Sequence, residues 1–180
     1  MRRGPLRPVL ALLVGALAVS ACAVPSGFRD PRAPFSASTR FDAAQMRGTW
    51  VVRARFAAAD DDLGGNPERF EIGTVSGDGF AVTWHHLTCN AWECVGLTDD
   101  LVARITGPGR FTLPRGADPA AEHWVLWTDS GFRVAAIGTP NGDFGWIMTR
   151  GAVRDDLMAA AREIFEWNGY DLTRLQGVQE

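Results

Sequence analysis

The sequence predicts an all-β domain, an eight-stranded antiparallel up-and-down β-barrel with one C-terminal α-helix packed outside it. Residues 49–150 are short β-branched and aromatic runs separated by Gly, Pro, Asn and Asp, a pattern typical of consecutive hairpins. Residues 152–169 instead repeat apolar side chains at helical spacing. Closure into a barrel leaves no strand edge open, and eight strands enclose room for one small ligand.

The expected strands follow one another without a long interruption. They cover residues 49–56, 69–75, 80–87, a broken strand over 93–97 and 101–105, and then 109–113, 123–127, 132–138 and 144–150. The helix over 152–169 carries Asp155 and Asp156 in its first turns, where the helix dipole favours negative charge. Asn168 and Gly169 are suited to end the helix, and residues 170–179 are expected to return as a short strand.

The first 21 residues predict a cleaved signal peptide. Arg2 and Arg3 precede an apolar run over 9–19 that is too short to span a bilayer as a helix. The run ends in VSAC, which resembles the lipobox of bacterial lipoproteins. That resemblance implies cleavage before Cys22 and acylation of Cys22, palmitate included, and Ala23 resembles the pattern of lipoproteins sent to the outer membrane. An ordinary cleaved signal peptide is the alternative.

The remaining chain is expected to form a tether and one domain. Residues 22–40 contain Pro, Ser and Arg without periodicity, which predicts a flexible lipid-anchored tether. Residues 41–180 would form the barrel domain. The chain holds 18 arginines, no lysine and 21 acidic residues, so its net charge of −3 and lack of a basic run argue against nucleic acid as a partner.

Three motifs carry a resemblance to a known family. They are Gly48-Thr49-Trp50 at the start of the first strand, Thr128-Asp129 between the sixth and seventh strands, and Arg150 at the end of the eighth. With these motifs the chain resembles the lipocalins, close to the bacterial lipoprotein lipocalins and the apolipoprotein D group. The resemblance implies that Arg150 stacks on Trp50 across the closed end of the barrel, a structural contact and not a catalytic one.

The alternation along the strands predicts which side chains face the barrel interior. If Trp50 points inward, every second residue of its strand does too, and the same rule applies to the other strands. The side chains predicted to contact a ligand are Phe56, Phe80, Trp84, His86, Trp124, Leu126, Trp146 and Met148. This aromatic lining suits an acyl chain, although the same rings would also fill a barrel that has no usable cavity. Arg53, Arg55 and Arg133 are weaker candidates for a carboxylate or phosphate head group.

The segment HHLTCNAWEC, residues 85–94, has two interpretations. On a strand, His85 and His86 point to opposite faces, and His85 and Cys89 are roughly 13 Å apart, too far to share one metal ion. An extracytoplasmic protein keeps disulfides, and Cys22 is assigned to the lipid. We therefore expect a disulfide between Cys89 and Cys94 and no metal site; a Cys₂His metal site formed by a tight turn is the alternative.

The sequence predicts a binding protein and not an enzyme. It lacks a Gly-x-Ser-x-Gly elbow, a glycine-rich phosphate loop and a His-Glu-x-x-His motif, and it implies no cofactor. The expected role is binding, storage or transport of a fatty acid or lysolipid at the bacterial cell envelope, anchored to the outer membrane and facing the periplasm. The alternatives are an envelope enzyme acting on lipids in the same barrel and a structural lipoprotein with a filled barrel. The sequence leaves open whether the chain forms a homodimer.

Overall fold

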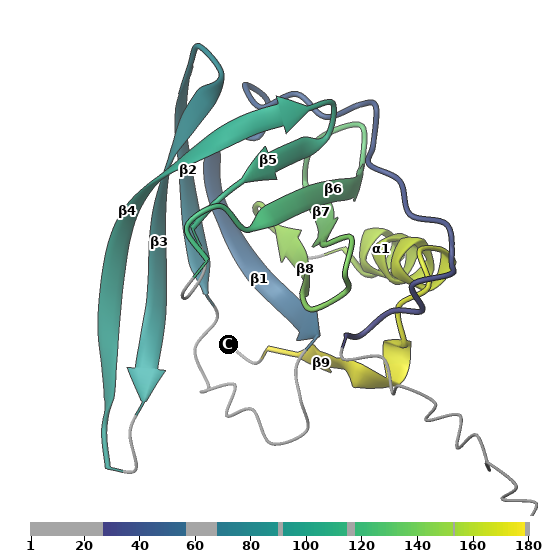
Figure 1. The fold of residues 1–180 in the computed structure, drawn as a ribbon. Helices are drawn as coiled ribbons and strands as arrows, with labels where there is room; N and C mark the ends of the chain where they lie inside the picture. Colours follow the sequence, from purple (N-terminus) through teal and green to yellow (C-terminus); the bar gives the residue numbers. More distant parts are fainter. Residues whose placement is uncertain (1–26, 57–67, 90–91, 115–117, 153, 179–180) are drawn as a thin grey trace, which may run out of the picture.

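The computed structural model describes residues 27–56, 68–89, 92–114, 118–152 and 154–178 (Figure 1). The predicted signal peptide, residues 1–21, and the predicted acylation site, Cys22, lie outside these residues. Within the described ranges, no helix is long and apolar enough to cross a membrane.

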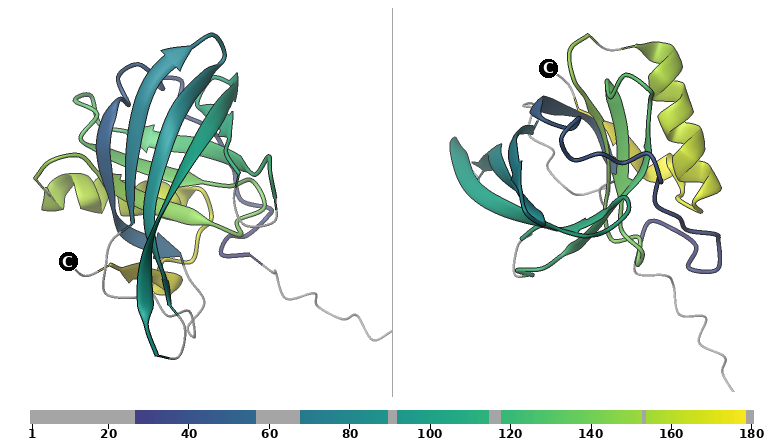
Figure 2. Two further views of the ribbon diagram at one scale, coloured as in Figure 1. Left: turned by 90° about the vertical axis from the view of Figure 1, so that its left-hand side faces the viewer. Right: turned by 90° about the horizontal axis from the view of Figure 1, so that it is seen from above.

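The chain forms a closed antiparallel barrel of eight strands with one helix outside, as predicted. The strands are β1 (Gly48–Phe56), β2 (Arg69–Ser76), β3 (Gly79–Cys89), β4 (Cys94–Gly107), β5 (Arg110–Thr112), β6 (Glu122–Thr128), β7 (Val134–Gly138) and β8 (Gly145–Thr149). Each strand pairs with the next, and β1 pairs with both β8 and β2, which closes the barrel (Figures 1 and 2). The helix α1 (Asp155–Trp167), a 3₁₀ turn (Leu172–Arg174) and β9 (Leu175–Gly177) follow, and β9 pairs with the end of β1 outside the barrel.

The fourth strand differs from the prediction. The sequence predicts a strand broken between residues 97 and 101, but β4 is one continuous strand of 14 residues. Thr98, Asp99 and Asp100 bridge the predicted break, and each pairs with a residue of β3. Cross-strand hydrogen bonding outweighs the low strand propensity of the two aspartates.

The apolar side chains form two clusters separated by the barrel wall. One cluster fills the barrel and contains Trp50, Phe80 and Trp146. The other lies between the outer face of β6–β8 and α1, and contains Ile147, Phe165 and further helix residues. Because α1 covers these strands, β7 and β8 are buried on both faces.

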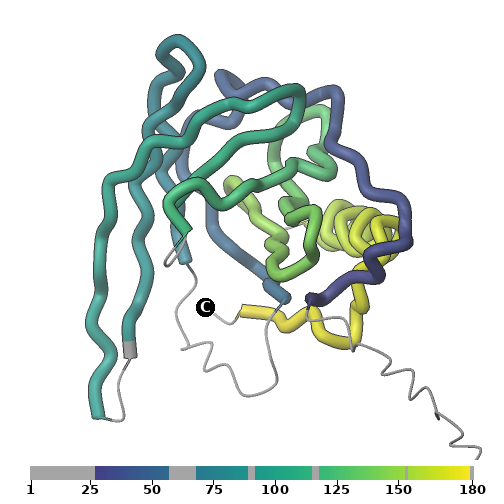
Figure 3. Tube along the Cα trace, viewed as in Figure 1, coloured from purple at the N-terminus to yellow at the C-terminus, as the bar shows by residue number. Residues whose placement is uncertain are grey.

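Residues 27–40 do not form the flexible tether that the sequence predicts. The Phe28 N–H donates to the carbonyl oxygen of Gly142, and the Ser38 N–H donates to that of Val125 at 2.7 Å. Arg29 is 6% exposed. Its guanidinium donates to the backbone oxygens of Asn168, Pro140 and Ala33 at 3.1, 2.7 and 2.8 Å. This segment therefore packs against the barrel and the helix, and the path of the trace along them can be followed in Figure 3.

Candidate functional site

The interior of the barrel is lined by a continuous series of rings. Neighbouring ring centres lie 4.1–5.9 Å apart from Phe80 through Phe111, His123, Phe144, Trp146 and Phe70 to Trp84. These separations are those of stacked and edge-to-face aromatic pairs. The series runs from Phe80, near the start of β3, to Trp84, toward the open end, at which β1 and β3 terminate and which lies opposite the Trp50–Arg150 contact.

Four of the predicted ligand contacts belong to this interior. Phe80, Trp146 and Met148 are buried in the interior cluster, and Trp84 packs against it while partly exposed. The ring of His86 stacks on that of Trp84 at 3.9 Å, so His86 lies on the same face of β3. Contact of any of these residues with a ligand stays a prediction.

The predicted inward position of Phe56 is wrong. The pairing of β1 with β8 shifts by one residue between Val52 and Ala54, so Arg53 is an extra residue in β1. Beyond such a bulge the two faces of a strand exchange. Val52 therefore lies in the interior cluster, whereas Ala54 and Phe56 lie in the cluster beneath the helix.

The predicted inward positions of Trp124 and Leu126 are wrong for the same reason. The pairing of β6 with β7 shifts between Val125 and Trp127, so Leu126 is the extra residue. Val125 faces the interior, whereas Trp124 and Leu126 pack on the helix side. Counting back by twos from the inward Thr128 ignores the bulge and gives the wrong face.

His123 is an interior residue that the sequence reasoning missed. Its side chain is fully buried, its Nδ1 lies 2.8 Å from the backbone oxygen of Ala121, and its ring stacks on Phe111 at 5.3 Å. The signal that would have found it is the alternation of β6 counted from Val125 instead of from Trp124.

The bulge in β1 also turns Arg55 into the barrel. Arg55 is directly opposite Trp146 of β8, whose side chain belongs to the interior cluster, and residues opposite one another share a face. The Arg55 guanidinium forms an ion pair with Glu68 at 2.6 Å, and Glu68 also accepts a hydrogen bond of 3.1 Å from the indole N–H of Trp84. Within the described residues, the buried Nε of Arg55 has no hydrogen-bond partner.

The other two candidate arginines are engaged elsewhere. Arg53 donates a hydrogen bond of 3.0 Å from Nε to the hydroxyl of Thr149. Arg133 pairs with Asp129 at 2.8 Å, at the closed end of the barrel and away from the opening. Arg55 is therefore the candidate that the structure places in the interior near the opening.

The two histidines of HHLTCNAWEC point to opposite faces of β3, as predicted. His86 pairs with Asp99 at 2.9 Å, while His85 lies 3.1 Å from the hydroxyl of Thr98 and 3.4 Å from Glu71. Among the residues that the structure describes, no group of three His, Cys, Asp or Glu side chains is arranged to hold a metal ion.

Of the two cysteines of the segment, Cys89 ends β3 and Cys94 begins β4. The backbones of Cys89 and Cys94 are directly opposite one another, the arrangement that a bond across the hairpin requires. The Cys89 side chain is not among the described ones, so the disulfide stays a prediction.

The closed end of the barrel holds the remaining predicted motif residues. The guanidinium carbon of Arg150 lies 5.2 Å from the centre of the Trp50 ring. The Trp50 indole N–H donates to the Met46 backbone oxygen at 2.7 Å. Gly48 has a φ of 118°, a conformation that favours glycine, and a Cβ at this position would lie 3.6 Å from the Arg150 side chain.

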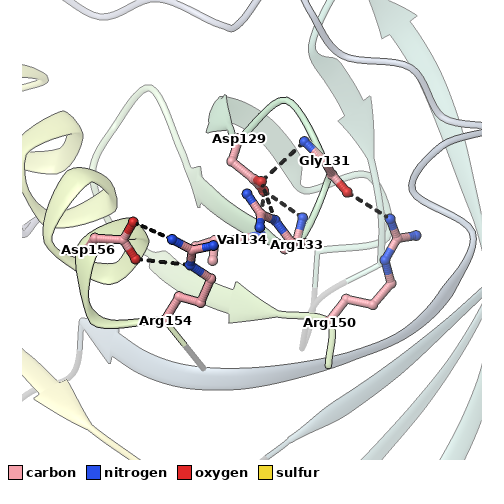
Figure 4. A network of polar contacts seen from close by, with 7 residues as sticks. All are labelled: Asp129, Gly131, Arg133, Val134, Arg150, Arg154 and Asp156. Carbon is pink, nitrogen blue, oxygen red and sulfur yellow. Dashed lines mark hydrogen bonds and ion pairs between the residues drawn. The ribbon is translucent and has the colours of Figure 1, made fainter. Parts of the chain in front are cut away.

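Asp129 organises the turn between β6 and β7 (Figure 4). Burial alone would raise the pKa of this carboxyl. Hydrogen bonds from the backbone of Val134, the side chain and backbone of Arg133 and the backbone of Gly131 outweigh the burial, so its pKa is lowered. The neighbouring Thr128 is buried. These contacts fix the turn at the closed end of the barrel.

A separate polar hollow of about 330 Å³ opens between residues 118–122 and residues 139–143. Its lining includes the carboxylates of Asp118, Glu122 and Asp143. Negative charge makes it unsuited to an anionic head group, so the interior near Arg55 is the better candidate site.

Comparisons with known proteins agree with this architecture. A family model described as a lipocalin-like domain matches residues 110–180. A search of curated proteins finds none that matches.

Solved structures share the fold at low identity. Lobster apocrustacyanin A1 is 17% identical, with 82% of this chain and 89% of that chain covered and a TM-score of 0.60. The cockroach allergen Per a 4 is 17% identical, with 83% and 96% covered and a TM-score of 0.60. The siderocalin Ex-FABP, described as functioning through dual ligand specificities, is 15% identical, with 76% and 95% covered and a TM-score of 0.56. The described chain therefore has the lipocalin fold, with a lipocalin-like domain recognised over residues 110–180.

Proposed function

We propose that the protein binds a small amphiphile with an apolar tail and an anionic head group, of the fatty acid or lysophospholipid class. The tail would contact the aromatic interior, and the head group would meet Arg55. We further propose that the protein is attached through an acylated Cys22 to the outer membrane of a bacterial envelope and faces the periplasm. Its role is then storage or transport of the ligand.

The position of Arg55 is the observation that carries the proposal. A guanidinium turned into a barrel is costly unless it is paired, and Glu68 supplies one partner at 2.6 Å. The buried Nε of Arg55 has no partner among the described residues, so a donor remains for an incoming anion. Hydrogen bonds between charged groups are roughly twice as strong as neutral ones, and the half-buried setting reduces screening by water.

The aromatic interior supports the apolar half of the ligand. Trp84 is partly exposed and packs against the buried Phe70, so the lining nearest the opening retains accessible apolar surface. An acyl chain gains about 0.8 kcal/mol for each methylene that leaves water. Such binding breaks no bond, as the proposed carrier role requires.

Equilibrium binding of two matched ligands tests the proposal. Palmitate and hexadecanol have chains of the same length but differ in head-group charge. We expect the full chain to bind palmitate more tightly than hexadecanol. Arg55→Gln should lower the affinity for palmitate by about tenfold or more and change the affinity for hexadecanol little, because one charge-assisted hydrogen bond to the head group is lost. Arg104→Gln is the control, since Arg104 is a largely exposed arginine on the barrel wall.

Each remaining outcome counts against a part of the proposal. Equal affinity for the two ligands in the unmodified protein would overturn the head-group assignment. No binding of either ligand would overturn the carrier function and favour the filled barrel. Recovery of a chemically altered ligand would favour the envelope enzyme.

A further inference from the structure

The hairpin of β3 and β4 extends beyond the rest of the sheet. The last residue of β3 that pairs with β2 is His85, whereas β3 and β4 remain paired as far as Cys89 and Cys94. The pairing of β4 with β5 is confined to residues 104–107. Within the described residues, the end of the hairpin is therefore a two-stranded ribbon that projects past the barrel, as Figures 1 and 2 show. A ribbon without a third strand is marginally stable in water, so its length needs an explanation other than barrel closure.

The ribbon carries exposed apolar side chains. Trp92, at its tip, is 95% exposed, and Val95 and Leu97 are 48% and 44% exposed. Val95 and Leu97 lie on the same face of β4 as Ala103, which is buried in the interior cluster. The interior face of the barrel thus continues onto the ribbon, interrupted by Asp99, which His86 pairs with at 2.9 Å.

The N-terminal segment leaves the domain at the same end as the ribbon. The ring of Phe28 lies 5.8 Å from that of Phe56, the last residue of β1, and the Phe28 backbone donates to Gly142 in the loop between β7 and β8. β1 and β3 both end at the open end of the barrel, because consecutive strands run in opposite directions. The first described residues therefore lie beside the opening.

The ribbon is long enough to reach the bilayer into which a lipid on Cys22 would insert. Gly27 is five residues after Cys22 in the chain, so a lipid on Cys22 keeps the open end within about 17 Å of the bilayer. The ribbon continues for four residues past His85, which is roughly 13 Å of strand. The length of the ribbon beyond His85 is thus similar to the maximum span of residues 22–27.

We propose that the tip of the β3–β4 hairpin contacts the lipid surface, holds the opening of the barrel toward the membrane, and gives an amphiphile a direct path between the bilayer and the interior. This rests on the acylated anchor and the amphiphile ligand of the proposed function. Tryptophan suits the contact because its ring is apolar while its N–H remains hydrated at the interface. Val95 and Leu97 then shield the apolar tail of the amphiphile from water while it moves between the bilayer and the interior.

Fluorescence quenching tests the contact without requiring any ligand. The full acylated chain is reconstituted in vesicles of phosphatidylethanolamine and phosphatidylglycerol, with and without brominated acyl chains that quench tryptophan on contact. We expect the bromolipids to quench part of the emission, and Trp92→Phe to remove about half or more of the quenched component. An unchanged quenched component in Trp92→Phe would overturn the proposal. Absent quenching, together with a dimer that Trp92→Ser dissociates, would assign the tip to a second copy of the chain and overturn it as well.

The rate of ligand transfer from vesicles to the protein tests the proposed path between the bilayer and the barrel interior. The rate at which a fluorescent palmitate analogue moves from vesicles to the protein is compared for the unmodified chain, Trp92→Ser and the control Val102→Ser. Val102 is also exposed, at 61%, but lies on the opposite face of β4. We expect Trp92→Ser to slow transfer by about tenfold with unchanged equilibrium binding, and Val102→Ser to leave both unchanged.

The two proposals fail in different ways. Equal transfer rates in Trp92→Ser and the unmodified chain would overturn the path while palmitate binding persists. If the unmodified chain binds no palmitate at all, the proposed function fails, and the quenching result still decides whether the tip touches the lipid surface.

Discussion

Arg150 and Trp50 close one end of the barrel by direct contact. The guanidinium carbon lies 5.2 Å from the centre of the indole, and the same guanidinium donates hydrogen bonds to the backbone oxygens of Gln45 and Arg47 at 2.9 and 2.7 Å. The contact thus joins the end of β8 to the segment that precedes β1. A cation over an indole face contributes about 0.5–2 kcal/mol, and the buried ring adds its apolar area.

Trp50→Ala should lower stability substantially and leave ligand preference unchanged. The side chain is fully buried, so its removal is expected to cost about 3–5 kcal/mol in the free energy of unfolding. Urea denaturation monitored by circular dichroism measures the difference. The ratio of palmitate to hexadecanol affinity is the control, because Trp50 lies at the end away from Arg55. Equal unfolding midpoints for the variant and the unmodified protein would contradict the prediction.

Tyr170 should titrate far above an ordinary tyrosine. Burial raises its pKa to about 12, and its hydroxyl lies 2.8 and 3.1 Å from the carbonyl oxygens of Phe144 and Thr139. Because the chain contains one tyrosine, the tyrosinate absorbance reports this residue alone. The midpoint should be near 12 in the folded protein and near 10 in denaturant.

The same shift predicts a loss of stability at high pH. The folded state holds the proton more tightly than the unfolded state, so the stabilisation is complete below about pH 10 and falls between about 10 and 12. Tyr170→Phe should remove this slope, because phenylalanine does not ionise. A slope of equal size in the variant would show that another group causes it.

Asp129 should stabilise the protein at neutral pH and less so in acid. Its folded pKa is lowered, so the unfolded state binds the proton first as pH falls. The stabilisation is therefore present above the unfolded value of about 3.9 and is lost as pH falls through the folded value. Asp129→Asn should cost about 2–3 kcal/mol at pH 7 and flatten the acid limb of a plot of melting temperature against pH. Exposed Asp30→Asn serves as the comparison.

Arg29 should fasten the N-terminal segment to the domain. Arg29→Ala would leave three backbone oxygens without the donors that they have now, at an expected cost of about 3 kcal/mol. Hydrogen exchange should then increase at Phe28 and Ser38, whose N–H groups bond to the barrel. Arg32→Ala is the matched control, because Arg32 is exposed in the same segment. Equal protection in the two variants would refute the role of Arg29.

A disulfide between Cys89 and Cys94 should staple the projecting ribbon. The loop that it closes is short, so the chain-entropy gain is modest, about 2 kcal/mol. Thiol counting on the unreduced protein with an acylated Cys22 should find no free thiol. Two free thiols would exclude the bond.

The sequence predicts the barrel and the helix well because both depend on local signals. Turn residues divide the strands, and the change from a period of two to a helical period predicts a helix over 152–169, within which α1 extends from Asp155 to Trp167. The segment from Phe28 to Ser38 was misassigned because its contacts are isolated residues, such as the buried Arg29, and not a periodic pattern.

The interior of the barrel is harder to predict, because the face that a residue occupies depends on every residue before it in the strand. Phe80 and Trp146 were placed correctly, since no bulge separates them from the reference residues of their strands. Phe56 and Leu126 were not, because one extra residue in β1 and one in β6 exchange the faces. In β6 the sequence gives no sign of the exchange. Because α1 packs on the outer face, β6 carries large apolar residues on both faces, and no polar residues mark the outer one.

The bulge at Arg53 decides which side chain at the end of β1 faces the barrel interior. If β1 continued past Val52 without the bulge and with all its residues, the regular alternation would place Phe56 in the interior and Arg55 outside. The same sequence would then present a neutral aromatic opening in place of a cationic one. Deletion of Arg53 would make β1 regular and keep Arg55 facing the interior, so the charge of the lining depends on the backbone irregularity that accommodates Arg53.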